Sequence, residues 1–391
     1  MGAWLRLTAL AAAGATSLAV VSGAAGLGAA HRLLAALALP PLVALLVAAW
    51  IGHRRLVVPA LIALALFGLA ALLTAHVPHV CAASLAFGAT VVVAALTFRG
   101  ATVPRASVRD YVTLTKPRIM SLLLLTGLCG MFVGAGGVPP VWLIAVTMLG
   151  LALACGGASA LNHVLDRDID RLMGERTRAR PLPADRMPAS SALEFGLALS
   201  AFSFVLLASA VNVLTATLAL VGNLFYVLVY TGWLKRSTPQ NIVIGGAAGA
   251  VPPLVGWAAA TGNLTLPALW LFLIVFFWTP PHFWALALLL KENYAAARVP
   301  MLPVVRGVGA TTRQIVGYSL VLVGITAAPF AAGTLGLGYL VSALVLGAVF
   351  IWLALALLRA ASRRRAALLF HYSLVYLALL FITMAVDAFL G

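Results

Sequence analysis

The sequence predicts an all-α, polytopic membrane protein. Of its 391 residues, 63% are hydrophobic and 9% are charged, whereas soluble domains average roughly 45–50% and 25%. A soluble fold of this length cannot bury so much apolar surface. The apolar residues form runs long enough to cross a bilayer as helix, and not the short alternating segments of a β-barrel. Soluble and disordered classes are therefore excluded.

Thirteen apolar segments are candidate membrane helices. They lie at 5–26, 33–52, 57–75, 80–98, 119–135, 141–161, 190–210, 213–233, 242–260, 267–287, 314–333, 338–358 and 368–389. With the N-terminus in the cytoplasm, 24 of the 25 Lys and Arg residues fall in cytoplasmic loops or helix ends, and only Arg32 does not. This asymmetry supports the span count and a multi-pass cell-membrane protein. The net charge of +16 then indicates contact with membrane lipid, and no nucleic-acid partner.

Five of the nine acidic residues lie in one predicted cytoplasmic loop and the helix end before it. In the run NHVLDRDID, Asn162, Asp166 and Asp170 are four residues apart and line one face of a helix. Oxygen ligands of this kind suit Mg²⁺, which often completes its shell with substrate phosphates. Arg176 and Arg180 follow closely, and guanidinium groups suit phosphate oxygens. The pattern predicts a magnesium diphosphate site; the alternative is a solvated, charged helix end.

Three more polar clusters fall on the same predicted membrane face. The candidate substrate-binding and catalytic residues that they supply are Lys116, Arg118, Tyr230, Lys235, His282 and Lys291. Each basic residue alone is equally typical of a positive-inside anchor. Their convergence with the acidic run predicts one cavity, open to the cytoplasm, for an anionic diphosphate with an apolar tail among the helices. His163 lies off the acidic face and is expected at the membrane interface.

At these residues the sequence resembles the UbiA-type intramembrane prenyltransferases. The NxxxDxxxD run and the RTRARPLP tail that follows are similar to the first aspartate-rich motif of that family. The segments LTKPRIMSLLLLTG (114–127), TPQNIVIGGAAGAVPP (238–253) and WTPPHFW (278–284) resemble the haem-farnesylating branch of the family and differ from its quinone and chlorophyll branches. The likeness covers roughly 105–391.

The resemblance implies a nine-helix bundle and a Mg²⁺-dependent transfer of farnesyl from farnesyl diphosphate to the 2-vinyl group of haem B, giving haem O. It implies metal binding by Asn162, Asp166 and Asp170. It assigns the diphosphate oxygens to Lys116, Arg118, Arg180 and Lys235. Taken with the residue patterns described above, the candidate catalytic residues are Asp166, Asp170, Lys235 and His282, and the candidate substrate-binding residues are Lys116, Arg118, Arg176, Arg180, Tyr230 and Lys291. Other haem-pathway or cytochrome oxidase assembly proteins are possible partners. The alternatives are a prenyltransferase acting on a quinone or chlorophyll precursor, and a haem-binding scaffold or transporter.

The second acidic motif departs from the family's pattern. The family typically has two adjacent aspartates after a lysine, whereas here Lys291 precedes Glu292 and Asn293. An amide oxygen can ligate a hard cation but brings no charge, so both residues remain candidate metal ligands and weaker turnover is expected. His282 has three readings: a haem-iron ligand, a base that orients water, or a hydrogen-bonded core residue.

Residues 1–98 are additional to the nine-helix enzyme. Their four predicted helices are joined by a cytoplasmic linker, 99–104, to the prenyltransferase domain at 105–391. His31 and His79 lie at the outer ends of the second and fourth helices, where two imidazoles could form a bis-histidine haem site. The alternative is a pair of interfacial histidines. The region resembles one four-helix half of haem A synthase, whose paired histidines ligate haem.

Overall fold

The computed structural model describes residues 2–24, 28–52, 56–72, 76–97 and 106–390. Within these ranges the chain is helical and contains no β-strand. Ten of the described helices are long and apolar enough to cross a membrane, and three shorter apolar helices lie near the N-terminus. Each of the thirteen predicted segments coincides with one of these helices or with two that follow end to end. The predicted all-α, multi-pass fold is therefore confirmed, whereas the predicted linker at 99–104 lies outside the described residues.

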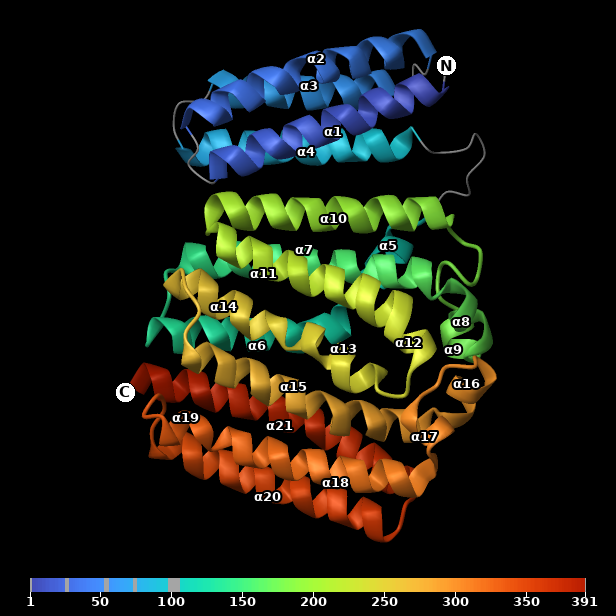
Figure 1. Cartoon of the computed structure of the whole chain (residues 1–391), viewed down its shortest axis with the longest axis vertical. Helices are drawn as coiled ribbons and strands as arrows, with labels where there is room; N and C mark the ends of the chain where they lie inside the picture. The colour runs from blue at the N-terminus through green and yellow to red at the C-terminus, as the bar shows by residue number, and fades with distance from the viewer. Residues whose placement is uncertain (1, 25–27, 53–55, 73–75, 98–105, 391) are drawn as a thin grey trace.

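The first four helices form a bundle with its own apolar core. They are α1 (Gly2–Ala24), α2 (Gly28–Gly52), α3 (Val57–Leu72) and α4 (His76–Leu96). This N-terminal bundle packs on the rest of the chain through α4 and α1, which contact α10 (Ala189–Ala210) (Figure 1). Gly88 of α4 faces the Phe202 ring so closely that no Cβ would fit there. Close packing against small residues is the usual means of helix association in membranes.

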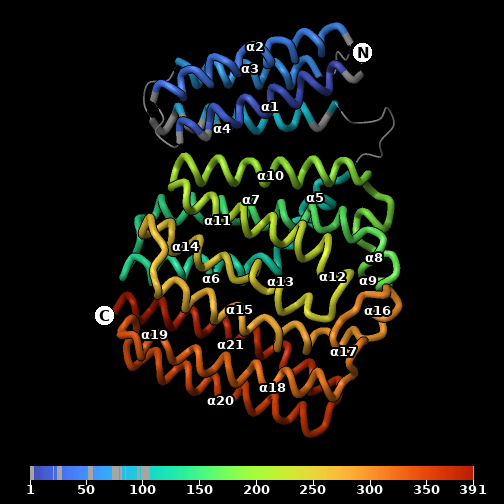
Figure 2. The backbone as a smooth tube through the Cα atoms, in the orientation of Figure 1, coloured from blue at the N-terminus to red at the C-terminus, as the bar shows by residue number. Residues whose placement is uncertain are grey.

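The remaining helices form the larger bundle. In chain order they are α5 (Val108–Thr115), α6 (Pro117–Ala135), α7 (Val141–Leu165), α8 (Arg167–Leu172), α9 (Glu175–Arg178), α10, α11 (Val213–Leu224), the π-helix η2 (Phe225–Leu234), α12 (Lys235–Ser237), α13 (Asn241–Gly249), α14 (Val251–Thr261), α15 (Leu266–Leu289), α16 (Lys291–Ala296), α17 (Leu302–Val305), α18 (Gly307–Thr326), α19 (Ala328–Ala331), α20 (Leu337–Arg359) and α21 (Arg363–Leu390). The backbone trace shows these helices running roughly side by side (Figure 2).

Short helices gather at one end of the larger bundle. Figure 1 shows α8, α9, α16 and α17 together at that end, opposite the end where α21 finishes. The short helices follow directly after membrane-spanning ones: α8 follows α7, and α16 follows α15. Asp166, Asp170 and Lys291, which are among the predicted site residues, belong to these junctions.

Breaks in regular helix occur where the predicted site lies. The α-helical backbone stops at Asp166, between α7 and α8, where φ is −90° and ψ is 5°. The bonds from Asp166 N to Asn162 O and from Asp170 N to Asp166 O, both 2.8 Å, carry the chain through the break. The expected single helix over 162–170 is therefore interrupted, although the four-residue spacing is kept. The π-turns of η2 are a second irregularity, of a kind frequent at functional sites.

Candidate active site

Asn162 and Asp166 lie at the end of α7 and are 3% and 2% exposed. The Asn162 amide nitrogen donates to Asp166 Oδ2 at 2.8 Å and to the Thr231 hydroxyl at 3.0 Å. Lys116 Nζ donates to Asn162 Oδ1 at 2.8 Å, and Lys235 Nζ donates to Asp166 Oδ2 at 2.6 Å. Residues from three separate segments therefore meet in one buried network, as the sequence predicts for Lys116 and Lys235.

Asp170 on α8 is 1% exposed and forms the second half of the site. Arg180 Nη1 donates to both of its carboxylate oxygens, at 2.7 and 2.8 Å. His163 lies on the other side, with Nδ1 3.9 Å from Asp170 Oδ2. The expectation that His163 sits at the membrane interface is wrong, because its side chain is buried beside the acidic run, at 1% exposure.

Local backbone geometry places the two lysines. Lys116 joins α5 to α6 in the left-handed region, with φ 49° and ψ 59°, a conformation that non-glycine residues seldom adopt. Pro117 starts α6 immediately after it, with its ring at the first helical turn, where proline is favoured. Burial first, and then the charge of Arg180, lowers the pKa of Lys116 to about 7. Lys235 follows directly on η2, whose residue Thr231 also contributes to the network.

The donor set fits a hard divalent cation. Asp166 Oδ2 accepts two hydrogen bonds, but Asp166 Oδ1 is buried without a hydrogen-bond partner in the described structure. Burying a carboxylate oxygen without a partner costs free energy. Coordination of Mg²⁺ by this oxygen would remove that cost. No group of three His, Cys, Asp or Glu side chains is already gathered for a metal among the residues described. The two carboxylates instead pair with Lys235 and Arg180.

The second motif stands apart from this network. Glu292 is exposed, and the Asn293 amide nitrogen donates to the backbone carbonyl of Met173. Asn293 therefore fastens α16 to the segment between α8 and α9. Tyr294 beside it is buried, and burial raises the pKa of its hydroxyl to about 12. Metal ligation by Glu292 and Asn293 stays a prediction.

The other predicted substrate-binding residues are more exposed than the members of the network. Arg118 and Arg176 are exposed, and Lys291 is half-buried. Tyr230 of η2 is also half-buried and stacks on Tyr226, with ring centroids 5.6 Å apart.

Four further ion pairs, which three aspartates make with arginines, hold the loops of this end in place, and the sequence did not assign them. Arg236 donates two hydrogen bonds of 2.7 Å to Asp168, and these lower the Asp168 pKa to about 2. The other three pairs are Arg186 with Asp110 at 2.9 Å, and Arg167 and Arg171 with Asp185 at 2.6 and 2.9 Å. Asp168 lies within the acidic run but points to an exposed arginine. It is therefore a tether of the loop, in contrast to its buried neighbours.

His282 lies deeper in the bundle, on α15, and is 7% exposed. Its ring is stacked on Trp278 at 4.3 Å and on Phe370 at 4.9 Å, measured between centroids. Its Nδ1 is 2.6 Å from the Ser373 hydroxyl, which itself donates to the Phe370 carbonyl. Because one hydroxyl carries one proton, Ser373 must accept from His282, which leaves Nε2 with the free lone pair.

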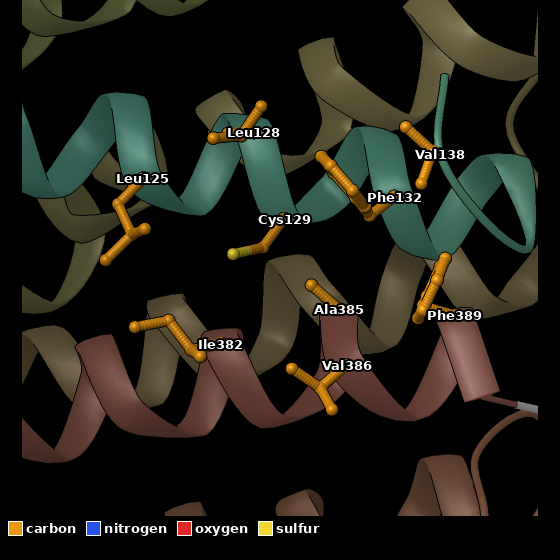
Figure 3. Close-up of a pocket in the computed structure, with 9 residues that line it drawn as sticks. All are labelled: Leu125, Leu128, Cys129, Phe132, Val138, Ile382, Ala385, Val386 and Phe389. Atoms are coloured by element: carbon orange, nitrogen blue, oxygen red, sulfur yellow. The ribbon is translucent and has the colours of Figure 1, made fainter.

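An apolar cavity of about 410 Å³ lies between α6 and α21 and is open to the outside of the bundle, where Val138, Val386 and Phe389 of its lining are exposed. Its lining residues are Leu125, Leu128, Cys129, Phe132, Val138, Ile382, Ala385, Val386 and Phe389 (Figure 3). All of these side chains are apolar, so the cavity suits hydrocarbon. It begins nine residues beyond Lys116 along the chain, or roughly 13 Å along a helix.

The two histidines of the N-terminal bundle are brought together. The His31 and His79 rings have centroids 5.8 Å apart and planes inclined at 82°. His31 Nδ1 lies 2.9 Å from the Ala19 carbonyl, and His79 Nδ1 lies 2.7 Å from the Ala70 carbonyl. A carbonyl can only accept, so both rings carry the proton on Nδ1 and a lone pair on Nε2.

A multi-pass helical bundle with a buried acid–base network at one end, and an apolar cavity open on one side between two of its helices, is typical of a membrane-embedded enzyme that acts on an amphiphilic anion. The model of the UbiA prenyltransferase family matches residues 123–382. The chain belongs to this family.

Curated relatives and a solved structure agree with this assignment. A protoheme IX farnesyltransferase of Symbiobacterium thermophilum is 56% identical over 72% of this chain and 94% of its own length. One from Chloroflexus aurantiacus is 46% identical over 85% of this chain and 59% of its own. The second match is longer than the 105–391 region and therefore extends into the N-terminal residues. The structure of a UbiA homologue from Archaeoglobus fulgidus bound to GPP and Mg²⁺ has a TM-score of 0.55 at 18% identity, covering 70% of this chain and 99% of that one.

Proposed function

We propose that this chain transfers a farnesyl group from farnesyl diphosphate to the 2-vinyl group of haem B, with Mg²⁺ bound at the acidic network. The observation that carries the proposal is the buried set of Asp166 and Asp170 beside Lys116, Lys235 and Arg180. Two carboxylates and three cations within one buried site suit a metal-bound diphosphate. The farnesyltransferase name of relatives up to 56% identical supports the acceptor and the donor.

The chain's own residues support ionisation of the donor. Lys116, Lys235 and Arg180 can turn from the acidic side chains to the diphosphate oxygens, where their charges stabilise the leaving group. Mg²⁺ bound by Asn162, Asp166 and Asp170 would neutralise the diphosphate charge that grows as the bond to the farnesyl carbon breaks. The resulting allylic cation must meet the vinyl carbon before it meets water, and the apolar interior excludes water from that region.

The cavity between α6 and α21 is suited to the farnesyl tail. A diphosphate held at Lys116 places the tail along α6, toward Leu125 and Cys129 at the near end of the lining. Burial of methylene groups there stabilises the complex by about 0.8 kcal/mol each. The enzyme would then select the length of the isoprenoid tail by how much of the cavity that tail fills.

His282 is proposed to serve the second half of the reaction. The terminal vinyl carbon bonds to the farnesyl carbon, diphosphate leaves, and a cation remains next to the porphyrin. Water adds to that cation and must lose one proton to give the hydroxyethylfarnesyl group. His282 Nε2 has the lone pair for that proton because Ser373 holds the ring through Nδ1. Stacking on Trp278 and Phe370 fixes the ring plane.

Mass spectrometry of the extracted haem tests the activity. Purified full-length protein with haem B, farnesyl diphosphate and Mg²⁺ is expected to yield haem carrying a hydroxyethylfarnesyl group. Asp166→Asn should lower the rate by about 10²–10³-fold. Asp185→Asn is the matched control, because Asp185 is exposed and its left-handed φ of 52° suits asparagine. Folded protein that prenylates a quinone or chlorophyll precursor but not haem would replace the proposal with its alternative.

We propose further that the protein lies in the cell membrane with the network facing the cytoplasm. The basic loops support this orientation. Single cysteines at Ala184 and Asn263, both exposed and at opposite ends of membrane helices, test it in whole cells. An impermeant maleimide should label Asn263→Cys and spare Ala184→Cys. The reverse labelling would invert the proposed topology. Association with other haem-pathway or oxidase assembly proteins remains a proposal that pull-down from the native membrane can test.

The paired histidines support a second function for the N-terminal bundle, which is haem binding. With metal–nitrogen bonds of roughly 2 Å, a bis-imidazole site places ring centroids about 6 Å apart, and His31 and His79 lie at 5.8 Å. Their Nδ1 hydrogen bonds to backbone carbonyls are of the kind that fixes the tautomer and ring orientation of metal-ligating histidines. Full-length protein should give a low-spin haem spectrum that His79→Leu abolishes and His371→Leu, on exposed His371, does not. An unchanged spectrum in His79→Leu would refute this function.

A further inference from the structure

His163 is a buried imidazole without a hydrogen bond. Its side chain is 1% exposed, and neither Nδ1 nor Nε2 has a hydrogen-bond partner in the part of the chain that the structure describes. Leaving a buried polar group unpaired costs about 1–3 kcal/mol. Native proteins rarely carry that cost without a function, so the contact of the imidazole is expected to form when a ligand arrives.

The surroundings indicate what that ligand is. The three cations of the site are already engaged, Lys116 with Asn162, Lys235 with Asp166 and Arg180 with Asp170. Asp166 Oδ1, one turn from His163, is also buried without a partner. An imidazole nitrogen and a carboxylate oxygen both offer lone pairs. A metal cation accepts lone pairs from both, and the cationic side chains that could donate hydrogen bonds to them instead are already engaged.

Asp170 can orient the ring. His163 and Asp170 are seven residues apart, close to two helical turns, and His163 Nδ1 is 3.9 Å from Asp170 Oδ2. A shift of about 1 Å brings this pair to hydrogen-bond distance. A carboxylate that accepts the proton of one ring nitrogen leaves the other nitrogen ready to ligate a metal, an arrangement common at metal sites.

We propose that His163 is a ligand of the divalent ion at the acidic network, with Asp170 holding its Nδ1–H and Nε2 facing the metal. The inference rests on the proposed function of that network and adds a nitrogen donor to its oxygen donors. A nitrogen donor raises the affinity of a site for first-row transition-metal ions, of which Mn²⁺ is the weakest binder, more than its affinity for Mg²⁺. The site is therefore expected to favour Mn²⁺ over Mg²⁺ more strongly than a site made of oxygen ligands alone.

Pulsed electron paramagnetic resonance of bound Mn²⁺ tests the proposal directly. Full-length protein is loaded with Mn²⁺ and farnesyl thiolodiphosphate, a poorly ionising analogue of the donor. The wild-type spectrum should contain the coupling of a ligating imidazole nitrogen, and labelling the protein with ¹⁵N-histidine should change that coupling. His163→Asn should remove it and lower the preference for Mn²⁺ over Mg²⁺ about tenfold. His371→Asn is the matched control, since exposed His371 lies on α21, and should keep it.

Each other result overturns the inference. Bound Mn²⁺ without histidine coupling in the wild-type protein would show that the shell contains oxygen alone, and the proposed transfer activity would stand. A coupling that persists in His163→Asn would assign it to another histidine. Absence of Mn²⁺ binding in the presence of the analogue would remove both this inference and the metal-dependent part of the proposed function. The isotope comparison uses wild-type protein, so the test does not depend on the folding of a variant.

Discussion

The pairing of Lys235 with Asp166 makes a stability prediction that can be separated from activity. Lys235 Nζ lies 2.6 Å from Asp166 Oδ2, and the two side chains are 11% and 2% exposed. Lys235→Met leaves the carboxylate with the Asn162 amide as its remaining donor. Removing one partner of a buried pair typically costs about 3–5 kcal/mol. Lys116, which is bound to Asn162, can partly replace the lost charge of Lys235. We therefore expect a loss of stability at the lower end of this range, about 3 kcal/mol.

A double-mutant cycle in mixed detergent micelles, with reversible unfolding followed by far-ultraviolet circular dichroism, measures this cost. Asp166→Asn should cost less, about 1–3 kcal/mol, because it leaves a flexible ammonium group and no buried anion. The double variant should be more stable than the sum of the two single changes predicts. Arg236→Met is the matched control: Arg236 pairs with Asp168 at 38% and 65% exposure, and exposed pairs contribute about 0–1 kcal/mol. If Lys235→Met costs no more than Arg236→Met, the pair is solvated and the buried-site argument fails.

Three further changes probe other parts of the chain. Asn293→Asp removes the donor to the Met173 carbonyl and should lower thermal stability by about 1–2 kcal/mol; unchanged stability with tighter Mg²⁺ binding would instead place this side chain on the metal. Ala385→Trp fills the cavity between α6 and α21 and should raise KM for farnesyl diphosphate more than for geranyl diphosphate, whereas equal effects would place the tail elsewhere. The hydrogen bond that Ser107 donates, together with Arg186, lowers the pKa of Asp110 in the folded protein. The ionised Asp110 carboxylate therefore stabilises the fold above its unfolded pKa of about 4, and this stabilisation is lost as the pH falls below that value. Asp110→Asn should make the melting temperature depend less on pH between pH 3 and about pH 5. A melting temperature that changes with pH as steeply as that of the wild-type protein would contradict this.

The sequence predicted the membrane helices well because one physical quantity, the length of an apolar run, determines them. It also identified Asn162, Asp166 and Asp170, since their four-residue spacing persists through the break at Asp166. What it could not supply is the partner of each charge. The pairing of Lys116 with Asn162 spans 46 residues, and that of Lys235 with Asp166 spans 69. Such contacts depend on helix packing and not on local pattern.

Two residues at the network, Thr231 and His163, could not be predicted from the sequence for a different reason. Thr231 is an ordinary residue in a π-helical segment, and only the packing of η2 against α7 brings its hydroxyl to Asn162. His163 lies one position from the acidic face, so helical periodicity placed it outside the site. Because the helix is interrupted after Leu165, Asp170 approaches the His163 ring, and His163 Nδ1 lies 3.9 Å from Asp170 Oδ2. A prediction that treats 162–170 as one continuous helix therefore places His163 away from Asp170.

Charge balance gives the paired acids of the site a functional meaning. When Lys116, whose pKa is about 7, is protonated, the three basic side chains of Lys116, Lys235 and Arg180 outnumber the carboxylates of Asp166 and Asp170 by one, so a divalent cation alone would add charge to a site that is already positive. A diphosphate ester carries about three negative charges near neutral pH, and together with one divalent ion it brings the buried charge close to zero. Metal and diphosphate must then favour each other's binding by the same factor. Lys235 and Arg180 would release the carboxylates to the metal as they turn to the diphosphate, which would account for the pairing of the proposed metal ligands with the proposed diphosphate donors before substrate binds.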